Sequence, residues 1–159
     1  MRVVIQRVSK ASVTVEGAVR AEIGQGLLVL VGLFTGDDEA QLAWMAEKLP
    51  ELRIFEDAQG KMNLSVRDVG GGILLVPNFT LAGDARKGRR PGFDQAMHPE
   101  QSQPMFEKFT AMVAAKGVPV QTGVFRSHMD VALVNDGPIT LVLDAPLTAN
   151  PSAPAASPA

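Results

Sequence analysis

The sequence predicts a single α+β domain in which a largely antiparallel or mixed sheet packs with two main helices. Segments in which apolar and polar residues alternate, the pattern of half-buried strands, outnumber those with a helical period. Short turns join many of these segments, which favours antiparallel neighbours. The phosphate-binding motifs of βαβ folds, GxGxxG and GxxxxGK(S/T), do not occur. The length of 159 residues and a hydrophobic content of 46% suffice for one domain with its own core.

The first segments are predicted to form a hairpin and then a central strand. Residues 11–15 and 19–23 alternate apolar and polar side chains, and Glu16-Gly17 between them is a hairpin signal. The run from Leu27 to Phe34 is apolar on both faces, which is typical of a strand covered on both sides of a sheet. We therefore place this run in the middle of the sheet.

Two helices are predicted from apolar residues spaced three and four apart. In the first, the aspartates at 37–38 can cap the N-terminus, and Pro50 ends the helix. In the second, Ser102 is the expected N-cap, Pro104 is tolerated in the first turn and Gly117 stops the helix. The apolar stripes are Leu42, Met45, Ala46 and Leu49 in the first helix and Phe106, Phe109, Met112 and Val113 in the second.

The rest of the chain is predicted to form strands and a tail. The strands are 52–55 and 62–64, joined by a turn at 57–60, then 73–79, 118–125, 131–135 and 139–144. The last fifteen residues contain six Ala, four Pro, two Ser and no charge. Such a segment buries too little apolar area to offset its ordering entropy. The domain is therefore expected to span residues 1–144, followed by a flexible Ala/Pro-rich tail at 145–159.

Composition excludes several classes of site. Fifteen Lys and Arg against seventeen Asp and Glu give a net charge of −2, which argues against a generally basic nucleic-acid-binding protein but not against a local basic patch. The absence of Cys excludes disulfides, thiolate nucleophiles and Cys-ligated metals, and His98 and His128 are the only imidazoles. We expect no metal and no cofactor.

The sequence also bears on location. No apolar run approaches the ~20 residues of a membrane-spanning helix, and the N-terminus turns polar too soon for a signal peptide. The expected location is the cytoplasm, with neither a membrane nor DNA as partner.

Two segments present main-chain groups that could act on a ligand. Asn135-Asp136-Gly137-Pro138 lies between two alternating segments and is predicted to be a turn, in the simplest case a plain hairpin. Alternatively its Gly-Pro bond is cis, as about 5–6% of X-Pro bonds are, and two successive carbonyls then point at an ammonium group. Residues 76–81, Val-Pro-Asn-Phe-Thr-Leu, end a strand. Thr80 could be a nucleophile or a polar anchor and the N–H groups could stabilise an oxyanion, or the segment is structural.

Two further segments have a functional and a structural interpretation each. Arg86-Lys87-Gly88-Arg89-Arg90 places four cations in five residues, for phosphate contact or simply in a solvated loop. Phe125 and Met129 could form an apolar floor for a base or aromatic group, or could belong to the core. His128 has no identifiable Ser or Asp partner, so a His-dependent hydrolase of small esters is the weakest hypothesis.

Motifs spread along the chain match one family. They are Ile5-Gln6-Arg7-Val8, Ala11-Ser12-Val13-Thr14-Val15-Glu16-Gly17, Gly26-Leu27-Leu28-Val29-Leu30, Arg53-Ile54-Phe55, Gly60-Lys61-Met62-Asn63-Leu64, Arg90-Pro91, Gln121-Thr122-Gly123 and Leu133-Val134-Asn135-Asp136-Gly137-Pro138-Ile139-Thr140. Together they resemble the D-aminoacyl-tRNA deacylase, or D-tyrosyl-tRNA(Tyr) deacylase, family. Phe79-Thr80-Leu81 and the Asn-Asp-Gly-Pro stretch, at this separation, make the match specific, and it covers residues 1 to about 144.

The resemblance implies a hydrolase of the ester between a D-amino acid and the 3′-terminal ribose of tRNA, with glycine mischarged on tRNA(Ala) as a further substrate. It implies a curved sheet and a homodimer with each site at the subunit interface. The Gly137-Pro138 pair would be cis and enter the partner's pocket. There its carbonyls would hold the α-amino group and leave no room for an L side chain.

Other roles are carried over position by position. Phe79 and Thr80 would place a backbone N–H near the scissile carbonyl, and Arg7 would brace the Gly-Pro turn. Phe125 and Met129 match positions near the terminal adenosine. In this family no side chain is clearly the nucleophile, and the ribose 2′-hydroxyl is thought to help activate water.

The chain departs from the family pattern at one strand end. Where the family usually reads Ser-Gln-Phe-Thr, this chain has Pro77-Asn78-Phe79-Thr80. Pro77 removes a backbone N–H and a hydroxyl, whereas Asn78 keeps an amide one methylene shorter and stays among the expected substrate-binding residues. The rival hypothesis is a non-catalytic tRNA- or chiral-ligand-binding module of the same fold.

Overall fold

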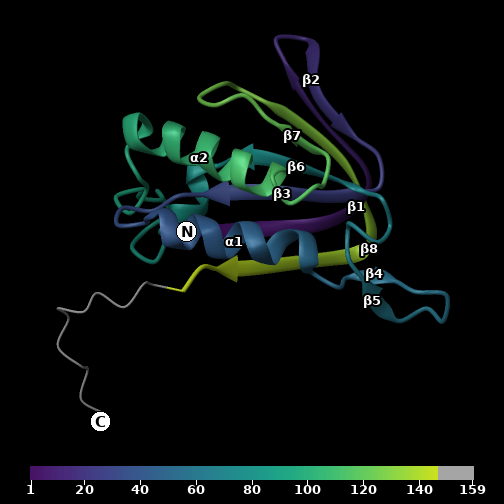
Figure 1. The fold of residues 1–159 in the computed structure, drawn as a ribbon. Coiled ribbons are helices and arrows are strands. Elements are labelled where there is room, and N and C mark those ends of the chain that lie inside the picture. The colour runs from purple at the N-terminus through teal and green to yellow at the C-terminus, as the bar shows by residue number, and fades with distance from the viewer. Residues whose placement is uncertain (147–159) are drawn as a thin grey trace, which may run out of the picture.

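One long strand organises the sheet of the computed structural model, which describes residues 1–146 (Figure 1). β1 (Arg2–Val15) pairs antiparallel with β2 (Ala18–Ile23) and β3 (Gly26–Gly32) on one edge and with β8 (Asp130–Asp144) on the other. β3 pairs parallel with β6 (Gly72–Pro77), and β6 pairs parallel with β7 (Val120–Thr122). The order β2-β1-β3-β6-β7, with β8 beside β1, confirms the predicted mixed sheet.

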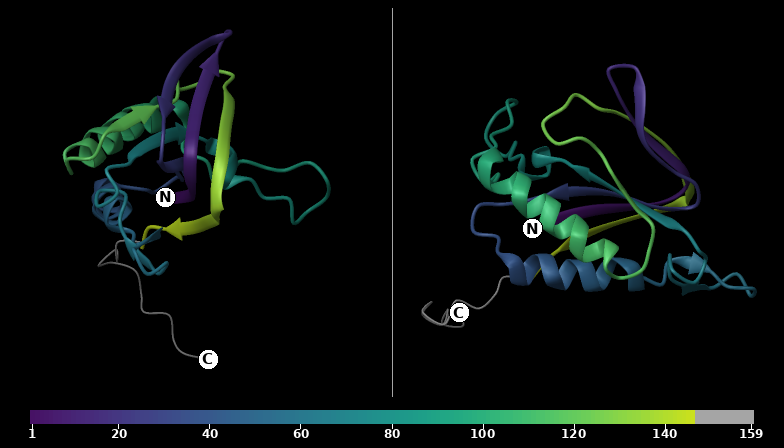
Figure 2. Two further views of the ribbon diagram at one scale, coloured as in Figure 1. Left: turned by 90° about the vertical axis from the view of Figure 1, so that its right-hand side faces the viewer. Right: turned by 45° about the horizontal axis from the view of Figure 1, so that its top comes forward.

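Two helices cover one face of this curved sheet (Figures 1 and 2). They are α1 (Glu39–Glu51) and α2 (Pro99–Ala114), and the predicted apolar stripes face inward. Leu42, Met45 and Leu49 of α1 and Phe109 of α2 are completely buried in the core between helices and sheet. Removing this much apolar surface from water is the main stabilising contribution to such a layer.

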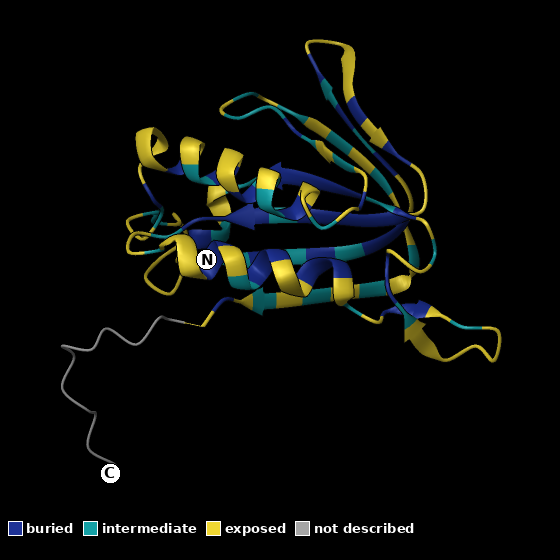
Figure 3. Ribbon diagram, viewed as in Figure 1, coloured by how far each residue is buried: buried dark blue, intermediate teal, exposed yellow. Residues whose placement is uncertain are grey.

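The curvature of the sheet encloses a second apolar cluster on the opposite face. Val8 and Val13 of β1, Leu28 of β3 and Leu74 of β6 belong to it. β3 and β6 are therefore buried on both sides, which the apolar run at residues 27–34 predicts for β3 (Figure 3). A separate hairpin of β4 (Phe55–Glu56) and β5 (Met62–Leu64) projects from one end of the molecule (Figure 1).

The start of α1 agrees with the sequence, whereas the end of α1 and the start of α2 differ from it. Asp38 caps α1 and forms a capping box with Gln41, and Pro50 lies in the last turn rather than ending the helix. The prediction that Ser102 caps the second helix is wrong, because α2 begins at Pro99. Proline at the first helical position has its φ preset for a helix and needs no N–H acceptor there, so the helix starts one turn earlier.

Residues 135–138 do not form the predicted hairpin turn. β8 runs without a break from Asp130 to Asp144 along β1, and its register shifts between Gln6 and Val8 of β1 and again between Val8 and Lys10. Turn-forming residues here mark a bulge inside a long strand, a use of the same residue types that local sequence cannot distinguish from a turn. The Gly137-Pro138 peptide bond is cis.

Three other boundaries are shorter or displaced. β6 ends at Pro77, and the next residues form a 3-10 helix, η1 (Phe79–Ala82), instead of extending the strand to residue 79. β7 comprises only three residues of the predicted 118–125. Ala145 is buried, and its N–H donates to the Met1 carbonyl oxygen at 2.9 Å. Residues 147–159, most of the predicted tail, lie outside the described residues.

Candidate active site

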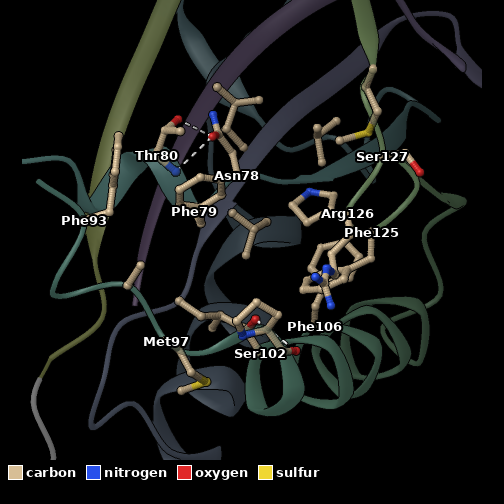
Figure 4. A pocket seen from close by; sticks show the side chains of 18 of the residues that line it. Asn78, Phe79, Thr80, Phe93, Met97, Ser102, Phe106, Phe125, Arg126 and Ser127 are labelled. Carbon is tan, nitrogen blue, oxygen red and sulfur yellow. Dashed lines mark hydrogen bonds between the residues drawn. The ribbon is translucent and has the colours of Figure 1, made fainter. Parts of the chain in front are cut away.

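A groove of about 1140 Å³ opens beside the carboxyl end of β6. Its walls come from four separate parts of the chain: residues 30–33 at the end of β3, residues 76–80, the loop at 93–99 with the first turns of α2, and residues 125–131 (Figure 4). The sequence-predicted residues Asn78, Phe79, Thr80, Phe125 and Met129 all line it. Ligands of mixed character commonly bind in grooves of this kind, which are mostly apolar with a few polar groups.

Asn78 fixes the strand end on the first wall. Its N–H donates to the Val31 carbonyl oxygen at 2.8 Å, which continues the pairing of β6 with β3. Its side-chain oxygen accepts hydrogen bonds from the Thr80 N–H at 3.2 Å and from the Thr80 hydroxyl (Figure 4). Asn78 thus caps η1 in the manner of an Asx turn.

This cap determines which main-chain donor is available. The Thr80 N–H is occupied by Asn78, whereas the Phe79 N–H donates to no acceptor among residues 1–146. An unpaired N–H at the edge of a groove can stabilise negative charge developing on a carbonyl oxygen. The Thr80 hydroxyl, in turn, faces an amide oxygen, which is not a base and cannot activate it.

The opposite wall is aromatic and thioether-rich. Phe125 packs near Phe106 of α2, with ring centroids 6.4 Å apart and planes at 37°. Met129 lies against Gly123, where a Cβ would come within 2.8 Å of its sulfur. Across the groove, Phe79 and Phe93 pair edge to face at 5.2 Å, and Phe79 is 59% exposed. Such surfaces suit a flat base or ring.

The sequence did not identify the loop that closes the groove. Residues 92–98 reach it because Phe34 and Ala96 form a β-bridge and the Met97 N–H donates to the Leu33 carbonyl oxygen at 3.0 Å. Phe93, Met97 and Ser102 therefore line the groove (Figure 4). These contacts are long-range, and the only local signal was the Gly and Pro content near residue 92.

Gly137 and Pro138 lie elsewhere. Both are exposed, and neither lines the groove of its own chain. Beneath them the buried Arg7 donates from Nε to the Asp136 carbonyl oxygen at 2.9 Å and from Nη1 to the Ile54 carbonyl oxygen at 2.6 Å. Gly137 has φ of +122°, and a Cβ there would come within 2.7 Å of Arg7 Nη2. The guanidinium is thus in contact with the Gly-Pro segment.

The basic residues 86–90 form the tip of a loop that projects from the body of the molecule (Figure 2). Asp84 and Gly92 close its base through two backbone hydrogen bonds of 2.9 Å. Arg86 folds back on Asp84, and these hydrogen bonds lower the pKa of Asp84 to about 2. Lys87, Arg89 and Arg90 have no hydrogen-bond or ion-pair partner among residues 1–146.

The remaining ionisable residues near the groove do not assemble a catalytic triad. His128 is 95% exposed and lies 3.8 Å from the Asp130 carboxylate, whose side chain is 81% exposed. Within residues 1–146 no three His, Asp or Glu side chains gather closely enough to hold a metal ion. In the same part of the chain no helix is long and apolar enough to cross a membrane.

Comparison with known proteins shows to which family this chain belongs. The family model described as D-Tyr-tRNA(Tyr) deacylase matches residues 4–144. The chain belongs to this family. The D-aminoacyl-tRNA deacylase of Thermomicrobium roseum is 58% identical over 91% of this chain and 94% of its own length. The D-aminoacyl-tRNA deacylase of Myxococcus xanthus is 54% identical over 97% of this chain and 99% of its own length. Relatives so named are hydrolases of aminoacyl-tRNA.

Solved structures show the same fold. The c-Myc DNA Unwinding Element Binding Protein is 39% identical, with a TM-score of 0.87 over 92% of this chain and 99% of that chain. A probable eukaryotic D-amino acid tRNA deacylase is only 20% identical but has a TM-score of 0.76 over 89% and 97%. The deacylase family fold is therefore retained, including its curved mixed sheet.

Proposed function

We propose that this protein hydrolyses the ester of D-aminoacyl-tRNA in the cytoplasm and releases free D-amino acid and tRNA. Glycine mischarged on tRNA(Ala) is a further substrate in this proposal. The observation that supports it most directly is the unpaired Phe79 N–H at the edge of a groove with an aromatic wall, in a chain whose relatives bear the deacylase name.

In the proposed reaction, the 3′-terminal adenosine rests against Phe125 and Met129. The ester carbonyl oxygen accepts a hydrogen bond from the Phe79 N–H. Water adds to the carbonyl carbon, with the ribose 2′-hydroxyl helping to remove its proton. The 3′-oxygen then leaves with the electron pair of the C–O bond and takes up a proton. The protein contributes position and charge stabilisation rather than a nucleophile.

Selection of the D configuration is assigned to Gly137 and Pro138 of a second copy of the chain. These residues are exposed and lie outside their own groove, so they are free to enter a partner's. Their carbonyl oxygens would accept hydrogen bonds from the α-ammonium group. A main-chain wall beside the α-carbon excludes an L substituent of any size, so many D-amino acids are accepted.

The phosphates of tRNA are assigned to the loop at residues 86–90. Lys87, Arg89 and Arg90 are free to bind them, whereas Arg86 is already paired with Asp84. Phosphate contacts by Lys and Arg raise affinity without reading sequence.

The test is turnover. The purified protein is incubated with tRNA charged with the D or L form of one amino acid, and with glycyl-tRNA(Ala), and released amino acid is measured. We expect release from the D and glycyl esters and not from the L ester. Binding of D-aminoacyl-tRNA without release would support the rival hypothesis, a non-catalytic binding module.

A further inference from the structure

One hydroxyl is buried in the apolar part of the groove. Ser102 is only 9% exposed, yet it lines the groove next to Met97, Phe106 and Phe125 (Figure 4). Met97 and Phe106 are 8% and 5% exposed, so these apolar neighbours of the hydroxyl are themselves buried. Of the residues within 1–146 that line the groove, Ser102 is the only one with a buried polar side chain.

The protein satisfies this hydroxyl poorly. Ser102 lies in the first turns of α2, and its Oγ donates to the Pro99 carbonyl oxygen at 3.5 Å. That distance is well beyond the usual 2.7–2.8 Å for a hydroxyl donor, so the bond is weak. The lone pairs of Oγ accept nothing from residues 1–146. A buried hydroxyl without a good partner is unfavourable, and a ligand that supplies one gains affinity.

The surroundings define the chemistry of that ligand. Phe106 and Phe125 line the groove with Ser102 and offer aromatic surface to a flat ring, and an oxygen that already donates to a carbonyl can still accept an N–H. Building on the function proposed above, we propose that Ser102 accepts a hydrogen bond from the exocyclic amine of the terminal adenine. Ser102 is then a specificity residue for the base, not a catalytic residue.

A purely structural role predicts something different. Serine inside a helix often bonds back to the preceding turn, and the hydroxyl would then matter equally for every substrate. The recognition role predicts that removing the hydroxyl matters only when the ligand has the amine. The two roles are separated by changing the side chain and the base together.

The experiment uses D-phenylalanyl-tRNA whose 3′-terminal nucleoside is either adenosine or purine riboside, which lacks the 6-amino group. KM and kcat are measured for the wild type, Ser102→Ala, Ser102→Cys and Thr110→Val. Thr110 is the matched control, since its hydroxyl is also buried on α2, has no partner within residues 1–146 and does not line the groove.

We expect the wild type to prefer adenosine about 2- to 10-fold in KM, the range for one neutral hydrogen bond. Ser102→Ala should lose that preference by weakening only the adenosine substrate, Ser102→Cys should retain part of it, and Thr110→Val should behave as the wild type. An unchanged preference in Ser102→Ala overturns the proposal, and so does an equal loss on both substrates.

A second measurement separates this proposal from the proposed function. Filter binding of the two uncharged tRNAs requires no hydrolysis. If the wild type turns over neither ester but binds the adenosine-ended tRNA better than the purine-riboside-ended tRNA, in a Ser102-dependent way, the deacylase function fails and the recognition role stands. If hydrolysis occurs without any preference in binding or KM, the deacylase function stands and the recognition role of Ser102 fails.

Discussion

The hydroxyl of Thr80 is held by Asn78, and this bears on how the ester is cleaved. The acceptor of its proton is an amide oxygen, and no imidazole, carboxylate or ammonium is within hydrogen-bond reach of that hydroxyl in residues 1–146. A serine or threonine nucleophile needs a base to remove its proton. We therefore infer that Thr80 orders the strand end and does not attack the ester.

Thr80→Ala should accordingly retain hydrolysis of D-aminoacyl-tRNA, with kcat reduced less than about tenfold. Removing a true nucleophile lowers kcat by about 10⁴ or more, as known triads show. Single-turnover kinetics of Thr80→Ala and Thr80→Ser give the answer. A Thr80→Ala protein with no activity beside an active Thr80→Ser would establish a threonine-centred mechanism instead.

Two arginines on the same strand provide a contrast in burial. Arg7 is 4% exposed and satisfies the carbonyl oxygens of Asp136 and Ile54. Arg2 forms its pair with Asp144 at the surface, where the pair raises the pKa of Arg2 and lowers that of Asp144. Solvent screens the Arg2–Asp144 ion pair, whereas the hydrogen bonds of Arg7 are made by a buried side chain.

Arg7→Leu should lower the free energy of unfolding by at least ~2 kcal/mol, because it leaves two carbonyl oxygens without their donor. Arg2→Leu, the matched control, should lower it by less than ~1 kcal/mol. Urea unfolding followed by circular dichroism measures both. Equal effects would show that Arg7 does not brace the Gly-Pro segment.

At the scale of elements, the features that could be predicted are those that follow from the local pattern of apolar and polar residues. The apolar stripes of α1 and α2, the cap at Asp38 and the doubly buried β3 follow from side-chain spacing alone. Ser102 was misassigned because a residue suited to a cap also fits inside a helix that proline starts earlier. The wall at residues 93–97 could not be predicted, because a β-bridge from Phe34 brings it to the groove.

The basic loop also depends on a contact that composition does not show. One of its four cations is paired with Asp84, whose pKa, lowered to about 2 by the hydrogen bonds from Arg86, keeps the carboxylate charged at neutral pH. The loop therefore presents three free charges at its tip, not four.

Asp84→Asn should release the Arg86 guanidinium and strengthen tRNA binding, because the asparagine side chain carries no charge. The asparagine oxygen can still accept the hydrogen bond from the backbone N–H of Arg86, so the loop should keep its shape. The salt dependence should steepen by up to ~1 in log–log slope, and replacing both Arg89 and Arg90 with Ala should flatten it by ~1–2. Filter binding between low and moderate salt measures the slopes. Slopes unaffected by either change would leave the loop as a solvated surface.

At the scale of the whole molecule, the groove and the Gly-Pro segment are both present but apart. The outer edge of β8 makes no strand pairing within residues 1–146, and Val134 and Val142 on it are 46% and 58% exposed. Long unpaired edges with apolar side chains favour association. A symmetric dimer would give each groove the Gly-Pro segment of the other chain.

This arrangement predicts complementation between two inactive variants. Gly137→Ala damages only the segment that a chain donates, because alanine is strained at φ of +122° and its Cβ would meet Arg7. Phe125→Glu damages only the groove, where a carboxylate replaces the apolar surface proposed to hold the terminal adenosine. Each should be inactive alone, provided that thermal unfolding shows both to be folded.

In a mixed dimer, one site combines the intact groove of the first variant with the intact Gly-Pro segment of the second. Random pairing at equal amounts leaves about a quarter of all sites intact, so refolding the two together should restore about a quarter of wild-type turnover of D-aminoacyl-tRNA. A chain that used its own Gly-Pro segment would gain nothing from mixing, and activity at the level of the two variants alone would show that each groove is complete within one subunit.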